Sequence, residues 1–440
     1  MKIPAIKTSA TVLALATRVA SSVYCDSDDC AQNQPVGTPT STAACSTVSA
    51  LWAAQITATP KPTVIAKLAY DCINSVPLNK PAALRWIDEL KPYLEWQSTL
   101  AFLKTPPPEY FFPPHDIVAA LDTIRVDLEA GKYPNEYSWQ RDVFVKVFGP
   151  AHDGHLYVNP DILTNAMEWV RPLALVSISE DGTSPPVIKV YDDVASNPET
   201  ASILSLINGV DAATFLKDQI FAITGSQDPD AAYNSMFYSK SSAVSNNAGF
   251  FKQGGRTRYI YPGETTSFTF ENGTYLELLN IARLKGDWNG VKDGTSFFSK
   301  FAPGAGLANS TLVSTSSAAH TSTPTTMSPT SPTGVKGYPS PVVISRDSVV
   351  SGYFIDEPGF EDVAVLAVMS FGSDSPAEFQ KVIEDFFLRA INASKTKLIV
   401  DLQFNYGGYI FQGYDTCVVK AHLLLRGPCP ALYSSLLFIY

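Results

Sequence analysis

The sequence of 440 residues lacks any apolar run long enough to span a bilayer, so we expect no membrane-spanning helix. It also lacks a basic cluster: the formal net charge is −10 and the pI about 5.0, which argues against a nucleic-acid partner. The six cysteines have no spacing typical of a zinc site, and we expect neither a metal nor another cofactor. The content of 45% hydrophobic and 11% aromatic residues nevertheless supports a large core in two or three domains.

Residues 1–22 are typical of a secretory signal peptide. Lys2 and Lys7 supply a basic start, Thr11–Val23 is mildly apolar, and small residues suited to cleavage lie around Ala20–Ser22. We therefore expect a protein that is secreted or that enters the lumen of the secretory pathway.

Two further features are typical of secreted proteins. Cys45 and Cys72 flank a helical stretch and could form a disulfide in an oxidising compartment; the alternative is a pair of buried free thiols. Three Asn-x-Ser/Thr triplets predict glycosylation, at Asn272, Asn309 and Asn392.

Composition and periodicity divide the rest of the chain. A polar lead-in precedes helical segments, which include the stretches 84–103, 116–130 and 136–147. A β-rich region follows, and then a Ser/Thr/Pro-rich segment that cannot bury enough apolar surface to order itself. The expected divisions are 23–44 (flexible lead-in), 45–160 (helical), 161–307 (β-rich), 308–341 (linker), 342–416 (strand–helix–strand core) and 417–440 (atypical tail).

Alternating patterns predict several strands in the β-rich region. Ala174–Ile178 and Val187–Tyr191 flank an Asp-Gly turn. Tyr259–Phe270 and Tyr275–Leu284 are further strand candidates. The pair Asn208-Gly209, which is followed by an amphipathic segment, predicts a hairpin turn.

The stretch 363–402 predicts a strand, a helix and a second strand. Val363–Met369 is a continuous apolar run, Ser375 and Glu378 are typical of a capping box, and Leu398–Val400 is a short buried strand. The helix carries one apolar stripe, made of Phe379, Val382, Ile383, Phe386, Phe387, Ala390 and Ile391. Because such a crossover normally joins parallel strands, we expect an α/β core within an α+β multidomain chain.

A glycine pair, Gly407-Gly408, follows the second strand at the edge where open α/β sheets place their sites. Paired glycines let the backbone approach another group closely, and free N–H groups at such a turn can receive developing negative charge. A plain tight turn is the alternative interpretation.

The order of residues in this stretch resembles the nucleophile region of the S41 peptidases, the tail-specific or C-terminal processing serine proteases. The resemblance rests on a strand ending in Asp401, on Asn405, on the glycine pair and on Gly413-Tyr414-Asp415. It is strongest for the fungal branch related to the chlamydial protease-like factor. In that family the residue after the glycine pair is the nucleophilic serine, whereas this chain has Tyr409.

Two of the five histidines, His152 and His155, stand in the sequence Ala-His-Asp-Gly-His. Histidine is the usual general base at neutral pH. The S41 resemblance implies that His155, preceded by Asp153 and Gly154, is the catalytic base. Two alternatives stay open. One is a solvated turn, and the other is a metal site formed by His152, Asp153 and His155, although the spacing differs from the helical His-Glu-x-x-His pattern.

The resemblance has further implications for the inserted region and for the end of the chain. The family inserts a PDZ-like module, which takes peptides by strand addition, and Ile207-Asn208-Gly209 with the following helix is similar to the turn of such a module. After Asp415 the family continues into a further part of the protease domain, which carries the residue that orients the histidine. Residues 417–440 do not match that part, so we expect a truncated core.

These observations lead to two functional hypotheses. The first is a secreted serine-type endopeptidase with His155 as base, Asp153 and Asn405 in support, and the N–H groups of Gly408 and Tyr409 near the oxyanion. Its fungal relatives imply the processing of a secreted precursor in a mycotoxin pathway. The second is a pseudo-peptidase that binds peptides without cleaving them. The partner is a peptide or protein in both cases, and the oligomeric state is not predicted. A hydroxyl such as that of Ser373 within reach of the base would favour the first hypothesis.

Overall fold

The computed structural model describes residues 41–58, 61–244, 247–302, 334–416 and 436–439. Apart from the gaps just given, unit 1 comprises 41–237 and 249–302, and unit 2 comprises 238–248 and 334–439. The expected signal peptide, Asn309, and most of the lead-in, of the linker and of the tail lie outside the described residues.

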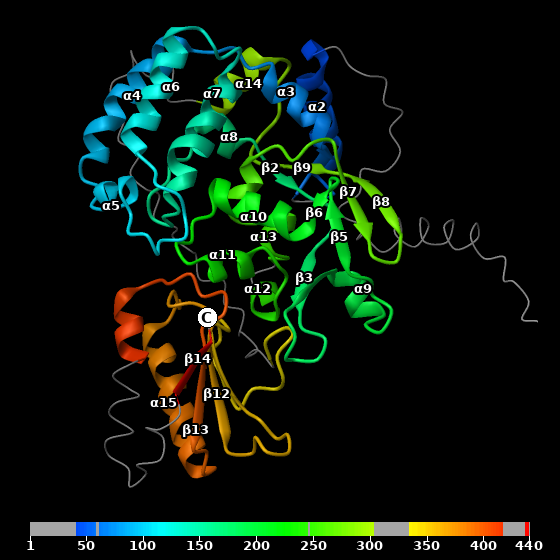
Figure 1. The fold of residues 1–440 in the computed structure, drawn as a ribbon, viewed down its shortest axis with the longest axis vertical. Coiled ribbons are helices and arrows are strands. Elements are labelled where there is room, and N and C mark those ends of the chain that lie inside the picture. Colours follow the sequence, from blue (N-terminus) through cyan, green and yellow to red (C-terminus); the bar gives the residue numbers. More distant parts are fainter. Residues whose placement is uncertain (1–40, 59–60, 245–246, 303–333, 417–435, 440) are drawn as a thin grey trace, which may run out of the picture. The chain divides into compact units, whose positions relative to one another are not determined.

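Unit 1 contains most of the described helices and three small sheets (Figure 1). Its helices are α2 (Ser41–Gln55), α3 (Ala66–Asn74), α4 (Lys80–Leu94), α5 (Leu100–Lys104), α6 (Ile117–Glu129), α7 (Glu136–Asp142), the π-helical η1 (Val143–Phe148), the 3-10 turn η2 (Gly149–Ala151), α8 (Asp161–Asn165), α9 (Tyr191–Ser196), α10 (Ala212–Ile223), α11 (Pro229–Ser235), α13 (Phe250–Gln253), the 3-10 turn η3 (Gly255–Tyr259) and α14 (Gly294–Phe301). Its strands are β1 (Thr63–Ile65), β2 (Met167–Val170), β3 (Leu175–Ile178), β4 (Val187–Val190), β5 (Leu204–Ile207), β6 (Val210–Asp211), β7 (Thr265–Phe270), β8 (Tyr275–Leu279) and β9 (Ile281–Leu284).

The helices α4, α6 and α7 begin where the sequence supplies a capping side chain. Asn79, Asp116 and Asn135 each accept a hydrogen bond from the backbone N–H three residues later, which satisfies one of the unpaired donors of the first turn. The expected helix over 116–130 is therefore present as α6. The one over 136–147 is present as α7, which η1 continues.

The expected helix over 84–103 is in fact two helices. The chain turns after α4 and starts α5 at Leu100, and both Leu94 and Leu103 are buried in the same core. A single straight helix would carry the second leucine away from that core, so burial overrides the continuous helical pattern.

A disulfide joins Cys45 of α2 to Cys72 of α3, as expected, so the alternative of two free thiols is wrong. The two cysteines are fully buried in a core that also takes in the three-stranded sheet β1-β9-β2. The bond therefore ties the first described helix to the centre of unit 1.

The β-rich region holds the hairpin β3–β4 and the four-stranded sheet β6-β5-β7-β8, on which α10 packs (Figure 1). The predicted hairpin around Asp181 is present, with its strands paired antiparallel. The predicted turn at Asn208-Gly209 is also present. Both residues have positive φ, 50° and 76°, which Asn and Gly tolerate best.

Two strand predictions in this region were too long. The stretch 259–270 becomes a strand only at Thr265: the 3-10 turn η3 ends at Tyr259, and residues 260–264, which include Gly263 with φ 97°, form neither helix nor strand. The stretch 275–284 divides at Asn280, whose fully buried side chain accepts a hydrogen bond from the Thr266 hydroxyl. Strands β8 and β9 therefore belong to different sheets.

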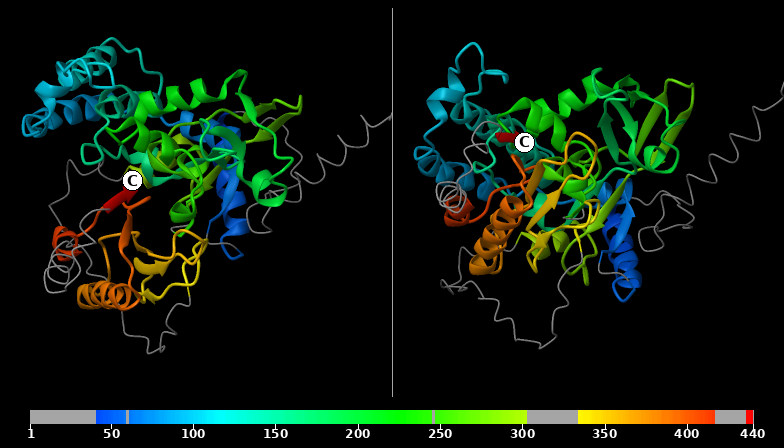
Figure 2. Two further views of the ribbon diagram at one scale, coloured as in Figure 1. Left: turned by 60° about the horizontal axis from the view of Figure 1, so that its bottom comes forward. Right: turned by 90° about the horizontal axis from the view of Figure 1, so that it is seen from below.

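Unit 2 is one five-stranded sheet with a long helix along it (Figures 1 and 2). Its elements are α12 (Lys240–Val244), β10 (Val343–Ile344), β11 (Val350–Phe354), β12 (Val363–Val368), α15 (Pro376–Asn392), β13 (Lys397–Asp401) and β14 (Leu436–Ile439). The strand order is β10-β11-β12-β13-β14, and β12, β13 and β14 run parallel. The predicted crossover is thus confirmed, whereas β14, within the tail, was not predicted.

The predicted apolar stripe of α15 is buried except for Ile391, which is 37% exposed. Gly352 of β11 lets the helix come close, because a Cβ on it would lie 2.1 Å from Cδ2 of Phe386. This contact fixes α15 against the antiparallel half of the sheet.

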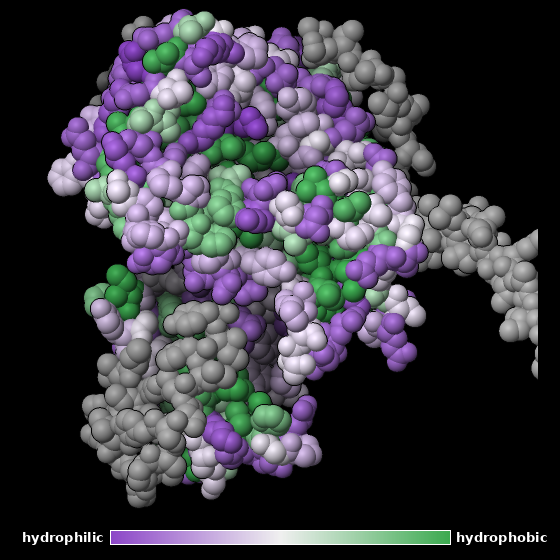
Figure 3. Space-filling model, viewed as in Figure 1, coloured by the Kyte–Doolittle hydropathy of each residue, from purple (hydrophilic) through white to green (hydrophobic). Residues whose placement is uncertain are grey.

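No helix among the described residues is long and apolar enough to cross a membrane. The face of unit 1 seen in Figure 3 mixes hydrophilic and hydrophobic residues. In unit 2, large apolar side chains are exposed on and beside the helical residues 410–416. These are Tyr406, Tyr409, Ile410, Phe411 and Tyr414, with exposed fractions between 63% and 79%.

Candidate active site

His155 lies on the turn that follows η2 in unit 1, and its side chain is fully exposed. The side chain of Asp153 shapes this turn by accepting hydrogen bonds from the N–H groups of His155 and Leu156, at 2.8 and 3.2 Å. The His155 ring nitrogen Nδ1 lies 4.0 Å from the same carboxylate oxygen. Because the imidazole is exposed and the turn that carries it is stabilised by a carboxylate, a substrate can contact the ring.

His152, three residues earlier, has a different environment. It is only 1% exposed, takes a left-handed backbone conformation with φ 49°, and stacks on the ring of Phe112 with centroids 3.6 Å apart. Burial lowers the pKa of His152 to about 4, although its hydrogen bond to the carbonyl of Thr224 opposes the shift. His152 is therefore a neutral core residue near pH 7.

Two side chains distant in sequence hold the His155 turn in place. Gln97 donates a hydrogen bond to the second carboxylate oxygen of Asp153, at 3.2 Å. Arg256 donates from Nη2 to the backbone carbonyls of both Asp153 and Leu156. The sequence offers no signal for either contact, because Arg256 lies 103 residues from Asp153.

The metal alternative does not fit this geometry. His152 is buried against Phe112, whereas His155 points into solvent. In the part of the chain that the structure describes, no three His, Cys, Asp or Glu side chains come together in a way that could hold a metal ion.

The glycine turn of unit 2 lies against the backbone that follows β12. The N–H of Phe371 donates to the Gly407 carbonyl at 2.9 Å. A Cβ on Gly408, which has φ 142°, would lie 2.3 Å from the carbonyl carbon of Phe371. Asn405 braces the turn by accepting from Gly407 N–H at 2.7 Å and donating to the Val368 carbonyl at 2.8 Å. The glycine pair thus permits a close backbone approach, as expected.

The two N–H groups expected near the oxyanion, those of Gly408 and Tyr409, differ in their hydrogen bonding. The N–H of Tyr409 donates to the Phe371 carbonyl at 2.7 Å and has no free proton to offer. The N–H of Gly408 has no acceptor among the described residues. The side chain of Tyr409 is 63% exposed.

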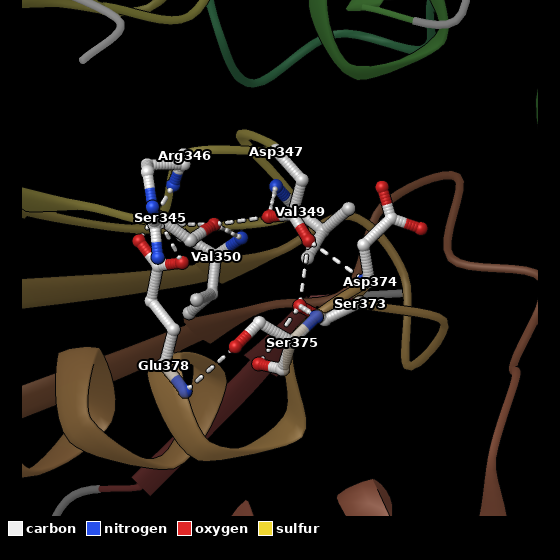
Figure 4. A network of polar contacts seen from close by, with 9 residues as sticks. All are labelled: Ser345, Arg346, Asp347, Val349, Val350, Ser373, Asp374, Ser375 and Glu378. Atoms are coloured by element: carbon white, nitrogen blue, oxygen red, sulfur yellow. Dashed lines mark hydrogen bonds and ion pairs between the residues drawn. The ribbon is translucent and has the colours of Figure 1, made fainter. Parts of the chain in front are cut away.

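Ser373 is committed to a buried polar network beside the start of α15 (Figure 4). Its hydroxyl donates to Asp347 at 2.6 Å, and Ser373 is only 3% exposed. Burial raises the pKa of Asp347, but hydrogen bonds from Ser345, Ser373 and backbone N–H groups outweigh burial and lower it overall. A hydroxyl bound to an ionised carboxylate supports the loop and is not available as a nucleophile.

Ser375 caps α15, as predicted, by accepting from the N–H of Glu378 at 3.3 Å (Figure 4). The reciprocal half of the predicted capping box is absent. The Glu378 carboxylate accepts instead from the backbone and guanidinium of Arg346, and the N–H of Ser375 donates to Ser373. An ion pair thus replaces the local hydrogen bond.

Sequence reasoning missed one more contact of this turn. Asp401, the last residue of β13, is 8% exposed and accepts a hydrogen bond from the Tyr338 hydroxyl at 2.9 Å. Burial and the Asp401 charge raise the pKa of Tyr338, which therefore stays protonated and keeps donating. The end of the strand before the glycine turn is fixed in this way.

The chain is similar to known proteins, both in a family model and over most of its length. Residues 168–289 match the family model of the CPAF-like PDZ domain. The peptidase S41 family protein phomP1' of Diaporthe leptostromiformis is 29% identical over 321 residues, which make up 70% of this chain and 47% of that protein. The chain is related to the peptidase S41 family proteins.

A further relative of this S41-related chain is ustP of Aspergillus flavus, a peptidase S41 family protein that is 38% identical over 84 residues, 19% of this chain and 18% of that protein. Among solved structures, mature CPAF complexed with lactacystin matches with a TM-score of 0.44 and 15% identity, over 77% of this chain and 59% of that one. The chain spans about half the length of phomP1'. The expected PDZ-like module is present as a CPAF-like PDZ domain.

Proposed function

We propose that this S41-related chain hydrolyses peptide bonds as a serine-type peptidase, with His155 as general base and the Gly408 N–H as a donor to the oxyanion. The N–H of Gly408 carries the proposal: it has no acceptor among the residues that the structure describes, and the turn that presents it is held by backbone hydrogen bonds at Gly407 and Tyr409. A rigid N–H donor at the site of developing charge needs no rearrangement during reaction.

An experiment must decide which hydroxyl is the nucleophile, because the position of a residue in the sequence does not identify it here. Tyr409 occupies the place of the family's serine, and Ser373 is bound to Asp347. Ser370 is another hydroxyl at this turn, with its Oγ 3.4 Å from the Gly407 carbonyl oxygen. Attack by either Ser370 or Tyr409 needs a base to take the hydroxyl proton, which is the role proposed for His155.

A second function, a pseudo-peptidase that binds peptides, is favoured by the same turn. Tyr409 stands in place of serine, and the exposed apolar side chains over 406–414 form a surface on which a peptide could pack. The CPAF-like PDZ domain offers a further peptide-binding element.

The two functions are distinguished by incubating the purified chain with a peptide library and detecting fragments by mass spectrometry. For a peptidase, His155→Gln should slow cleavage about 100-fold or more, and either Ser370→Ala or Tyr409→Phe should abolish it. His152→Asn is the matched control and should retain cleavage. Binding in fluorescence anisotropy without any cleavage would instead establish the pseudo-peptidase.

Secretion and precursor processing belong to the proposal as well. Expression in a fungal host should yield a secreted protein whose first residue follows a cut around Ala20–Ser22. Glycosylation at Asn272 and Asn392, which are both exposed, should be removable by an N-glycosidase. Retention of the intact chain inside the cell would contradict the secretory part of the proposal.

A further inference from the structure

The carboxylate of Asp401 connects the phenol of Tyr338 to the glycine turn of unit 2. Its two oxygens have different partners. Oδ2 accepts from the Tyr338 hydroxyl at 2.9 Å, and Oδ1 accepts from the backbone N–H of Gln403 at 2.9 Å. Asp401 is 8% exposed, so water competes little for either hydrogen bond. A side chain 63 residues away in the sequence is thus linked to the first residues of the turn.

The turn contains a strained residue directly after this contact. Phe404 has φ 60°, a left-handed backbone conformation that is a clear outlier for a bulky aromatic residue. Such a residue persists only where the surrounding contacts hold it. Hydrogen bonds hold the backbone on either side of Phe404: the N–H of Gln403 donates to Asp401, and the N–H of Asn405 donates to the Leu402 carbonyl at 3.0 Å.

The conformation of Phe404 determines where the next residues lie. The side chain of Asn405 accepts from the N–H of Gly407 at 2.7 Å and donates to the Val368 carbonyl at 2.8 Å. Gly408 follows, with an N–H that has no acceptor among the described residues. Relaxation of Phe404 to an ordinary backbone conformation would displace Asn405. The direction of the Gly408 N–H therefore depends on the contacts that hold Phe404.

Tyr338 has two neighbours that keep its hydroxyl at Asp401. Its ring stacks on that of Tyr353 in β11, with centroids 5.6 Å apart and 28° between the planes. Burial and the Asp401 charge raise the pKa of Tyr338, and the side chain of Ser241 in α12 opposes part of that rise. Ser241 is 1% exposed. Helix α12 lies within residues 168–289, which the PDZ family model matches, yet it belongs to unit 2.

We propose that Tyr338 is a positioning residue for the glycine turn: through Asp401 it holds Phe404 in its strained conformation, and it thereby directs the N–H of Gly408 toward the developing oxyanion. Tyr338 acts only through Asp401 and takes no part in the chemistry. The use of the Gly408 N–H rests on the proposed peptidase function, whereas the link from Tyr338 to the turn can be measured without any cleavage.

Amide hydrogen exchange of the full chain, followed by mass spectrometry of peptides that cover residues 402–409, tests the link. Tyr338→Phe keeps the ring and removes the hydroxyl. It should speed exchange in this stretch about tenfold, the effect of losing one hydrogen bond to a charged group. Tyr353→Phe is the matched control, because the Tyr353 hydroxyl donates to Ser351 at 2.8 Å and not to Asp401. Exchange like that of the parent in Tyr338→Phe, or equal acceleration in both variants, would overturn the proposal.

Relief of the strain provides a second readout, which a general loss of stability would not reproduce. Asn adopts the left-handed conformation at lower cost than Phe. In a chain that carries Phe404→Asn, the turn should need the Tyr338 hydroxyl less, so Tyr338→Phe should speed exchange by a smaller factor. An undiminished effect would show that Tyr338 does not act on Phe404, and the proposal would be wrong.

Peptide cleavage tests the use of the positioned N–H. Tyr338→Phe should lower kcat about tenfold and leave KM within about twofold, because the Gly408 N–H contributes in the transition state. Tyr353→Phe should change neither constant. A rise in KM with kcat unchanged would contradict the positioning role. If the parent chain cleaves no peptide, the proposed function fails, and the exchange comparison alone decides whether Tyr338 holds the turn.

Discussion

The burial of His152 predicts a specific dependence of stability on pH. The unfolded chain has an ordinary histidine pKa, about 6.5, whereas burial lowers the pKa of the folded state to about 4. The unfolded state therefore binds the proton first as the pH falls. The stabilisation is complete above about pH 6.5, is lost progressively below it, and has gone once the pH falls below about 4.

The magnitude follows from these two values. Between pH 7 and pH 5 the linkage removes about 2 kcal/mol from the free energy of unfolding, and the full loss at lower pH is about 3 kcal/mol. His152 is 1% exposed and its ring is stacked on Phe112, so screening by water is weak.

The test compares two substitutions of the same type. His152→Asn removes the buried titrating group and keeps a residue that tolerates the left-handed backbone; His155→Asn removes an exposed histidine from the same turn. Urea unfolding at pH 7, 6 and 5 should show about 2 kcal/mol less loss for His152→Asn than for the parent chain. His155→Asn should follow the parent. Equal losses in the parent and in His152→Asn would refute the reasoning.

Three further predictions concern stability. Gly408→Ala should destabilise unit 2 by about 3 kcal/mol, because its Cβ would collide with backbone. Gly407→Ala should cost only about 1 kcal/mol, from the positive φ of 90° alone, since no atom beyond its chain neighbours lies within 4 Å of its Cβ. Similar urea midpoints for the two variants would contradict the close approach. Ser373→Ala should cost about 1–3 kcal/mol and raise the pKa of Asp347, which loses a hydrogen bond; an unchanged carboxyl titration by NMR would contradict that network. Reduction of the Cys45–Cys72 disulfide should lower the stability of unit 1 by about 2–4 kcal/mol, and an identical melt with and without reductant would argue against the bond.

Local patterns in the sequence account for much of the fold. The crossover β12–α15–β13, the hairpin β3–β4 and the turn at Asn208-Gly209 were all predictable, because each depends on neighbouring residues: an apolar run, a cap or a turn dipeptide. The wrong predictions concern positions at which contacts between residues distant in the sequence determine where a strand ends. Asn280 ends one strand and begins another through its bond to Thr266.

In the candidate site, too, features set by neighbouring residues were predictable, whereas features set by distant contacts were not. The close approach at Gly408 follows from the glycine pair itself. Two other contacts join residues far apart in the sequence, and no local pattern indicates them. The Tyr409 N–H donates a hydrogen bond to Phe371, and Arg256 donates to the His155 turn. Nor does the sequence distinguish the buried His152 from the exposed His155, since both stand in one short polar stretch.

We propose, from the relationship to the S41 peptidases alone, that His155 and the turn at Gly407–Tyr409 serve one site. Replacing Tyr409 by p-benzoylphenylalanine tests it directly, because that position is aromatic and 63% exposed, and illumination then joins the residue to whatever lies beside it. Digestion and mass spectrometry identify the partner. The account predicts a cross-link to the peptide that contains His155. Cross-links confined to the residues of unit 2 would contradict it.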